Sequence, residues 1–210
     1  MESFEELLQQ AELAHGHMCA GQILGVRMVM LACRRLGVED PRGADRKKLV
    51  SFIEIDRCAT DAIGLVTGCR LGKRALKFRD WGKMAATFVN LATGRAVRIV
   101  ALENSRELAQ QRYPQIESKG QQQMMAYREL EDAELFREQW VAVELPDREM
   151  PGYKGQRVTC DECGEGVNFD RYVEVPAEVG SGKEGNFRRL CLSCADPGLR
   201  YWRALDAENQ

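Results

Sequence analysis

Residues 85–102 read AATFVNLATGRAVRIVAL, and this stretch decides the fold class. Two runs of strand-forming residues flank the triplet Ala92-Thr93-Gly94. A short link that contains glycine, between two such runs, is typical of a β-hairpin. Residues 49–55 and 74–78 are further runs of strand character. The sequence therefore predicts a mainly antiparallel sheet in the middle of the chain.

Helices are expected on both sides of these strands in the sequence. Residues 3–14 and 21–36 carry apolar side chains at helical spacing, and Gly16 and Gly37 follow them as stop signals. Further helices are expected at 60–67, from Asn104 onward, and throughout 118–140. This mixture predicts an α+β fold, with helices packed on a mainly antiparallel sheet.

The composition is that of an ordinary globular protein. The 210 residues carry a formal net charge of -2, which gives no overall attraction to nucleic acid or to anionic membranes. No apolar run approaches the roughly 20 residues that cross a bilayer, and the acidic start of the chain does not resemble a signal peptide. We therefore expect a cytoplasmic protein with no membrane span.

A domain boundary is expected near residue 150. Pro146 and then Pro151-Gly152 end the regular pattern and precede a cysteine-rich tail. We therefore expect an α+β domain at 1–150 and a small zinc-binding module at 151–210.

The tail contains two Cys-x-x-Cys pairs. A tight turn lets such a pair present two thiolates to one tetrahedral ion, so two pairs complete the coordination of a structural zinc. Strands are expected at 172–175 and 187–190 around a turn at 180–185, with a helix opening at Cys194. The helix would carry Leu199, Tyr201, Trp202 and Leu205 in a treble-clef-like arrangement. The four ligands are Cys160, Cys163, Cys191 and Cys194. Two disulfides or two redox pairs are the alternative interpretation.

A second constellation lies near the N-terminus. His15, His17 and Cys19 include both histidines of the chain. Whether the segment is extended or helical, at least two of these side chains share one side. Cys58 follows the predicted strand at 49–55, where functional side chains often lie. The alternative is that these are ordinary structural side chains, which is the role we expect for Cys33 in its apolar helix.

Four ordered blocks of this sequence resemble the FmdE family, which is named after formylmethanofuran dehydrogenase. They are 15–21, 54–63, 67–73 and 78–83, and the tail resembles the zinc module that many members carry. Ala20 is one departure, since the family usually has proline there, but no expected ligand is lost. The resemblance implies a metal cleft formed by His17, Cys19 and Cys58. Alternative or supporting ligands are His15, Asp56 and Cys69, and expected anion contacts are Lys73, Arg74 and Lys83.

Two functions follow from this resemblance. The first is a metal-binding accessory or regulatory protein of a molybdenum or tungsten oxidoreductase, holding zinc in the tail and a second transition metal of unknown identity in the cleft. The second is a stand-alone metalloenzyme whose cleft activates water or a small substrate. We also expect a homodimer. Residues 157–210 mix acidic and basic side chains without a basic stripe, which argues against nucleic-acid binding.

Overall fold

The computed structural model describes residues 1–177 and 187–203. The chain divides into two compact units, Met1–Leu145 and Pro146–Gln210. The boundary expected at residue 150 falls just inside the second unit. Along the part of the chain that the structure describes, no helix is both long enough and apolar enough to cross a membrane.

The first unit contains a five-stranded sheet. Its strands are β1 (Leu49–Ile53), β2 (Leu76–Phe78), β3 (Ala85–Asn90), β4 (Ala96–Ala101) and β5 (Phe136–Val141). They lie in the order β2-β1-β3-β4-β5, and all neighbours are antiparallel except β1 and β2. The hairpin predicted from residues 85–102 is present as β3 and β4. The predicted α+β fold with a mainly antiparallel sheet is therefore confirmed.

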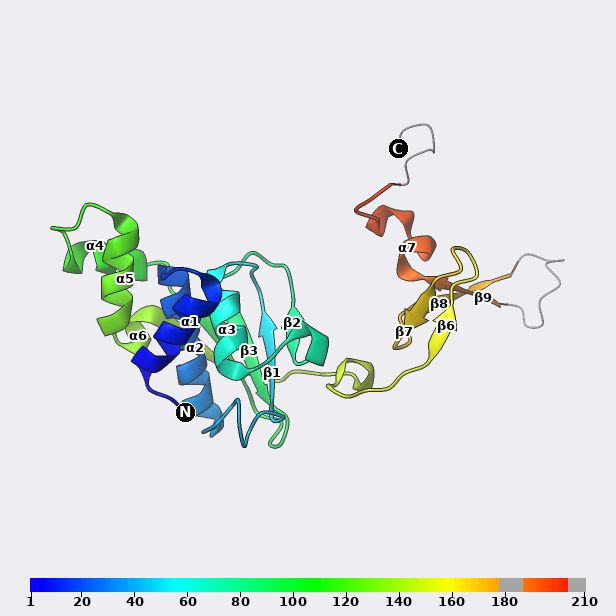
Figure 1. Ribbon diagram of the computed structural model, residues 1–210, viewed down its shortest axis with the longest axis horizontal. Coiled ribbons are helices and arrows are strands. Elements are labelled where there is room, and N and C mark those ends of the chain that lie inside the picture. Colours follow the sequence, from blue (N-terminus) through cyan, green and yellow to red (C-terminus); the bar gives the residue numbers. More distant parts are fainter. Residues whose placement is uncertain (178–186, 204–210) are drawn as a thin grey trace. The chain divides into compact units, whose positions relative to one another are not determined.

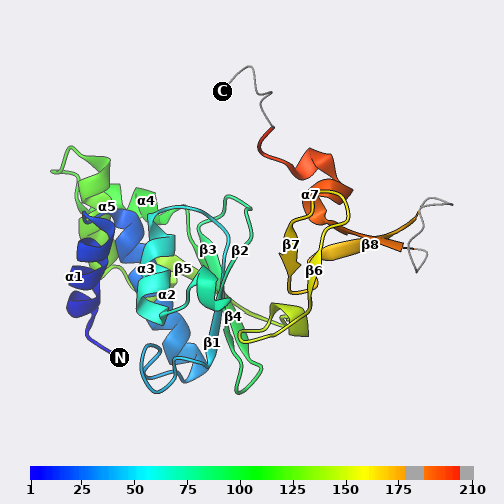
Figure 2. The same ribbon diagram turned by 45° about the vertical axis from the view of Figure 1, so that its right-hand side comes forward.

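Helices cover one side of this sheet. The helices of this unit are α1 (Phe4–His15), α2 (Ala20–Leu36), α3 (Cys58–Thr67), α4 (Ser105–Arg112), α5 (Lys119–Glu129) and α6 (Asp132–Leu135), and a 3-10 turn, η1 (Leu71–Lys73), precedes β2. Figures 1 and 2 show α2 and α3 beside the sheet, with α4 and α5 further from it. Fully buried apolar residues of α2, among them Ile23, Met28 and Leu31, fill the core between the layers.

The prediction of one helical stretch over 118–140 is wrong. Leu130 is extended (φ -58°, ψ 141°) and ends α5, and Glu131 opens a new turn with a capping box. The chain then forms β5, in which Phe136 pairs with Ala101 of β4 and is only 4% exposed. The edge of β4 offers backbone donors and acceptors that a fifth strand satisfies, and this tertiary pairing outweighs the helical propensity of the segment.

Close packing of α2 on α3 brings the N-termini of these two helices together. A Cβ at Gly25 would lie 2.6 Å from the carbonyl oxygen of Ala59 and 2.7 Å from the Cβ of Ala62. Real Cβ atoms do not approach other atoms so closely, so only glycine permits this distance between the helices. The first residue of α3, Cys58, therefore lies beside the first turn of α2.

The opposite side of the sheet carries a buried ion pair. The carboxylate of Glu54, with a side chain 3% exposed, accepts two hydrogen bonds from Arg98 at 2.7 and 2.6 Å. Val143 and Leu145, from the segment after β5, pack on neighbouring apolar residues of this face. Glu54 thus points away from the helical layer, although Cys58 follows it by four residues.

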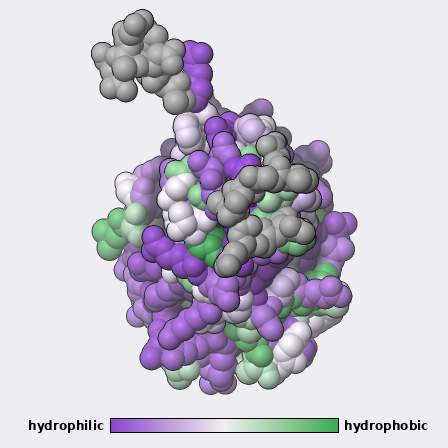
Figure 3. Space-filling view, turned by 90° about the vertical axis from the view of Figure 1, so that its right-hand side faces the viewer, coloured by the Kyte–Doolittle hydropathy of each residue, from purple (hydrophilic) through white to green (hydrophobic). Residues whose placement is uncertain are grey.

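The second unit is built from two small hairpins. Its strands and turns are η2 (Asp147–Glu149), β6 (Arg157–Thr159), β7 (Gly166–Asn168), β8 (Tyr172–Pro176), β9 (Phe187–Cys191), α7 (Leu192–Ala195) and η3 (Pro197–Leu199). β6 pairs with β7 and β8 pairs with β9, both antiparallel, so the expected strand pair around the cysteines is confirmed. The surface drawn in Figure 3 is mostly hydrophilic, with separate hydrophobic spots among the coloured residues.

The prediction of a helix from Cys194 to beyond Trp202 is wrong in its start and its length. The helical turn α7 begins at Leu192 and ends at Ala195, because Pro197 and Gly198 impose a separate 3-10 turn. Tyr201 and Trp202 follow in irregular structure and are exposed. The expected turn at 180–185 and Leu205 lie outside the described residues.

Candidate metal centres

Four cysteines converge in the second unit. Their sulfur atoms all lie within 4.8 Å of one another. Cys160 and Cys163 belong to the β6–β7 turn, whereas Cys191 ends β9 and Cys194 lies in α7. Zinc–sulfur bonds of about 2.3 Å place the sulfurs of a tetrahedral site roughly 3.8 Å apart, so a small contraction closes this cluster around one ion.

Backbone groups favour the thiolate form of Cys160. Burial opposes ionisation, but the backbone N–H groups of Cys163, Cys191 and Glu162 outweigh it and lower the pKa of Cys160 to about 6. The N–H of Cys191 donates to Cys160 Sγ at 3.3 Å. The thiolate is the form that binds metals, so the fold prepares this cysteine as a ligand.

The second cluster forms around a left-handed glycine. Gly16 (φ 91°) ends α1 and turns the chain between the two histidines, whose ring centroids are 4.7 Å apart. Cys19 then serves as the N-cap residue of α2. Donor atoms of His15, His17 and Cys19 lie within 4.8 Å of one another. The residue spacing alone allowed either a strand or a continuous helix. The segment instead consists of the end of α1, a turn and the start of α2.

Of the two ring nitrogens of His15, one has a hydrogen-bond partner and the other has none. Its Nδ1 lies 2.8 Å from Asp61 Oδ2, in α3, and its Nε2 is buried without a hydrogen-bond partner. A carboxylate on Nδ1 keeps the proton there, which leaves the lone pair on Nε2. Metal-ligating histidines have this arrangement in proteins, with the carboxylate orienting the ring. The donor set therefore fits a borderline transition metal.

Cys58 adjoins this cluster from α3. A Cβ at Gly21 would lie 3.0 Å from Cys58 Cβ and 3.8 Å from Cys19 Sγ, so the missing side chain of Gly21 makes room for both cysteines. Burial raises the pKa of the Cys58 thiol, and the neighbouring Cys19 thiol raises it further. Gln22, fully buried, donates from Nε2 to the carbonyl oxygen of Cys58 at 2.6 Å, while its Oε1 has no partner.

Sequence reasoning missed Gln22, Asp61 and the glycine contacts. Gln22 was detectable as a polar residue on an otherwise apolar helix, whereas the contact of Asp61 joins residues 46 apart in sequence. Of the other expected residues, Asp56 is exposed. Cys69 lies in the core, where its Sγ is 3.5 Å from Ser51 Oγ and from the Leu49 carbonyl oxygen. Lys73 and Lys83 are exposed, and Arg74 is half-buried.

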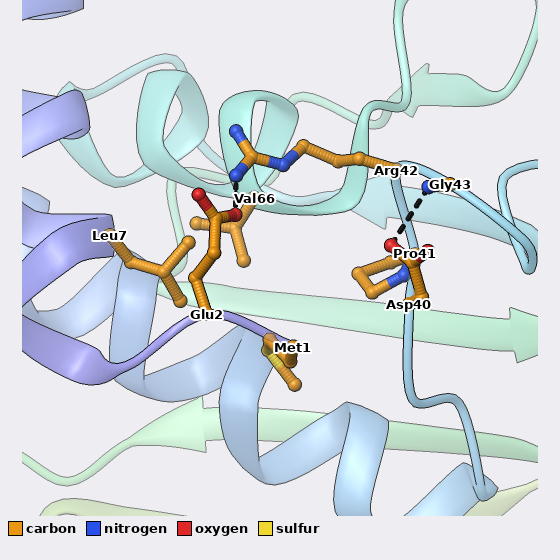
Figure 4. Close-up of a pocket in the computed structure, with 8 residues that line it drawn as sticks. All are labelled: Met1, Glu2, Leu7, Asp40, Pro41, Arg42, Gly43 and Val66. Carbon is orange, nitrogen blue, oxygen red and sulfur yellow. Dashed lines mark hydrogen bonds and ion pairs between the residues drawn. The ribbon is translucent and has the colours of Figure 1, made fainter.

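A cavity of about 550 Å³ lies elsewhere in the first unit. Figure 4 shows Glu2 and Arg42 paired across it, with Val66 near the C-terminal end of α3. The residues that line this cavity include no thiol or imidazole. We therefore do not assign the metal chemistry to it.

Comparison with known proteins places the chain in a family. Residues 14–144 match the family described as "FmdE, Molybdenum formylmethanofuran dehydrogenase operon". The chain belongs to the FmdE family. The match includes the histidine–cysteine cluster and the whole sheet, and it ends before the four-cysteine unit. The resemblance deduced from the four sequence blocks is thus confirmed.

Two relatives extend this comparison. A "Probable S-adenosyl-L-methionine-binding protein" of Archaeoglobus fulgidus is 31% identical over 211 residues, which cover 90% of this chain. The chain spans 52% of the length of that relative, so the relative contains about as much sequence again. A solved "tungsten formylmethanofuran dehydrogenase subunit e (fmde)-like protein" from Syntrophus aciditrophicus superimposes with a TM-score of 0.62 and 24% identity. Each of the two chains is covered to 95%, which shows a shared fold.

Proposed function

We propose that this FmdE-family chain is a metal-binding accessory or regulatory protein of a molybdenum or tungsten oxidoreductase. The metal-binding part of this proposal rests on the buried Nε2 of His15, which has no protein partner. The other ring nitrogen, Nδ1, contacts Asp61. An unpaired buried polar atom costs free energy unless something binds it, so this nitrogen supports a ligand role.

The proposed cleft ligands are His15, His17 and Cys19, with Cys58 beside them. This set differs from the one expected from the sequence, His17, Cys19 and Cys58, because the donor atom of His15, and not that of Cys58, falls within the 4.8 Å group. A bound ion would supply Lewis-acid chemistry and leave a coordination position open. His17 is exposed, so solvent or a partner has access to this position.

The four-cysteine unit is proposed to hold zinc in a treble-clef-like module. Four thiolates, with no histidine or carboxylate in the cluster, match a structural zinc site closed to other ligands. A unit with so small a core gains its stability from such an ion. Free thiols in this number also fit a reducing compartment, so we place the protein in the cytoplasm.

The accessory role is tested by what the chain binds in a cell extract. The tagged chain is captured under reducing conditions beside a Cys19→Ser variant, and molybdenum and tungsten are measured in both captured fractions. We expect enrichment of one of these metals with the unaltered chain. Equal background levels from both would contradict the accessory role.

The exposure of His17 also favours a second candidate, a stand-alone metalloenzyme. In that case the chain hydrolyses a simple activated ester when loaded with zinc or cobalt, and Cys19→Ser abolishes the metal-dependent rate. A rate that equals that of free metal would remove this candidate.

A further inference from the structure

Cys19 and Cys58 meet at the N-termini of two helices. Cys19 caps α2 and Cys58 is the first residue of α3. A Cβ added at Gly21 would lie 3.0 Å from Cys58 Cβ and 3.8 Å from Cys19 Sγ, so both side chains adjoin the space that Gly21 leaves free. Both residues are half-buried. The two side chains therefore adjoin the same space and are accessible to a small reagent.

The other cysteines differ in this respect. Cys33 and Cys69 are 1% and 3% exposed in the core. The four cysteines of the second unit form their own cluster. Reactive thiols are accessible and close to a resolving partner. Only the cleft pair, among the described cysteines of the first unit, combines these properties.

We propose that Cys19 and Cys58 are a redox-active dithiol, and that their disulfide and a cleft metal exclude each other. In the reaction, two thiols and a small disulfide RSSR give the Cys19–Cys58 bond and two RSH. The Cys19 thiolate attacks one sulfur of RSSR and expels RS⁻. The Cys58 thiolate then attacks the mixed disulfide at Cys19 and expels the second RS⁻. The protons of both cysteines end on the two RSH.

Geometry makes the second step intramolecular. A disulfide requires Cβ atoms about 3.5–4.5 Å apart, and Cys58 Cβ and Cys19 Sγ face the same space at Gly21. Once oxidised, Cys19 no longer offers a thiolate, and thiolate is the form that ligates metal. The mutual exclusion rests on the proposed metal function, whereas the dithiol stands on the position of the two cysteines alone.

The test treats the full chain, after gentle chelation, with oxidised glutathione. Free thiols are then blocked with N-ethylmaleimide and tryptic peptides are mapped by mass spectrometry. Cys19 lies in peptide 1–27, and Cys58 shares peptide 58–70 with Cys69. Cys69→Ala is therefore the matched control, because it removes the other thiol of that peptide and leaves the cleft intact.

We expect the linked peptide as the main product in the unaltered chain and in Cys69→Ala. In Cys58→Ser, Cys19 retains glutathione instead. Prior addition of zinc ions should reduce the linkage several-fold. Glutathione on both Cys19 and Cys58 without linkage would overturn the dithiol, even if metal binding at the cleft persists. If zinc does not slow formation of the linked Cys19–Cys58 peptide, the dithiol is supported, but the mutual exclusion of disulfide and metal is overturned.

Discussion

At the scale of single residues, one contact decides which nitrogen of His15 is available to a ligand. Asp61 orients the ring and fixes its proton on Nδ1, so that Nε2 has a lone pair in a buried position. The sequence predicted the histidine–cysteine cluster because rare residue types stood close together. It assigned Asp56 rather than Asp61 as the supporting carboxylate, because nothing local reveals a contact between residues 46 apart.

Replacement of Asp61 by Asn is expected to weaken cleft metal binding by about 10- to 100-fold, because the ring loses its orienting carboxylate. Asp56→Asn is the matched control, since Asp56 is exposed five residues away on the same segment. Affinities are measured by competition with a metal-sensitive dye. Equal affinities of the two variants would show that Asp61 does not support the site.

Asp45 gives the fold a defined response to acid. Its pKa is lowered to about 2 by the hydrogen bond to Lys48 and then by the N–H groups of Asp40 and Glu39. The ordinary value is 3.8, so the charged carboxylate stabilises the fold above pH 3.8, and this contribution is lost as the pH falls toward 2.

Asp45→Asn should therefore be less stable than the unaltered chain at pH 7, and the difference should shrink between pH 4 and pH 2. Urea unfolding at several pH values measures this, with the exposed Asp80→Asn as a control. A difference that stays constant down to pH 2 would contradict the role of the Asp45 charge.

At the scale of elements, the packing of α2 on α3 brings Cys58 and Asp61 beside the histidine–cysteine cluster. The sequence predicted both helices because their apolar periodicity is local information. It did not predict their close approach, since Gly25 becomes informative only when Ala59 and Ala62 lie against it. The parallel pairing of β2 and the edge strand β5 were missed for the same reason, because strand partners are set by tertiary contacts.

Gly25→Val is expected to separate α2 from α3, because a Cβ there meets Ala59 at 2.6 Å. Overpacking of this kind costs about 1–3 kcal/mol of unfolding free energy. Metal affinity at the cleft should fall as well, since Cys19 and the carboxylate that orients His15 lie on different helices. Gly72→Ala, whose added Cβ meets nothing within 4 Å, is the control. Unchanged stability of Gly25→Val would contradict the close packing.

At the scale of the whole molecule, we expect a homodimer. The apolar face of α2 is buried inside its own unit, so this helix leaves no apolar surface for a dimer interface. Exposed apolar side chains remain at Leu13, Met125 and Trp140, with 84%, 43% and 54% of their surface accessible. Light scattering should report twice the chain mass of 23.7 kDa. A particle of 23.7 kDa at micromolar concentration would contradict this.

We propose that the chain holds two metals in two independent sites. Metal content per chain, measured after purification with zinc or cobalt, tests it most directly. The unaltered chain should contain two ions. Cys19→Ser should retain one ion, and Cys160→Ser should lose the other and leave the second unit open to proteases while the first unit stays intact. One ion per chain, unchanged in Cys19→Ser, would contradict the cleft site.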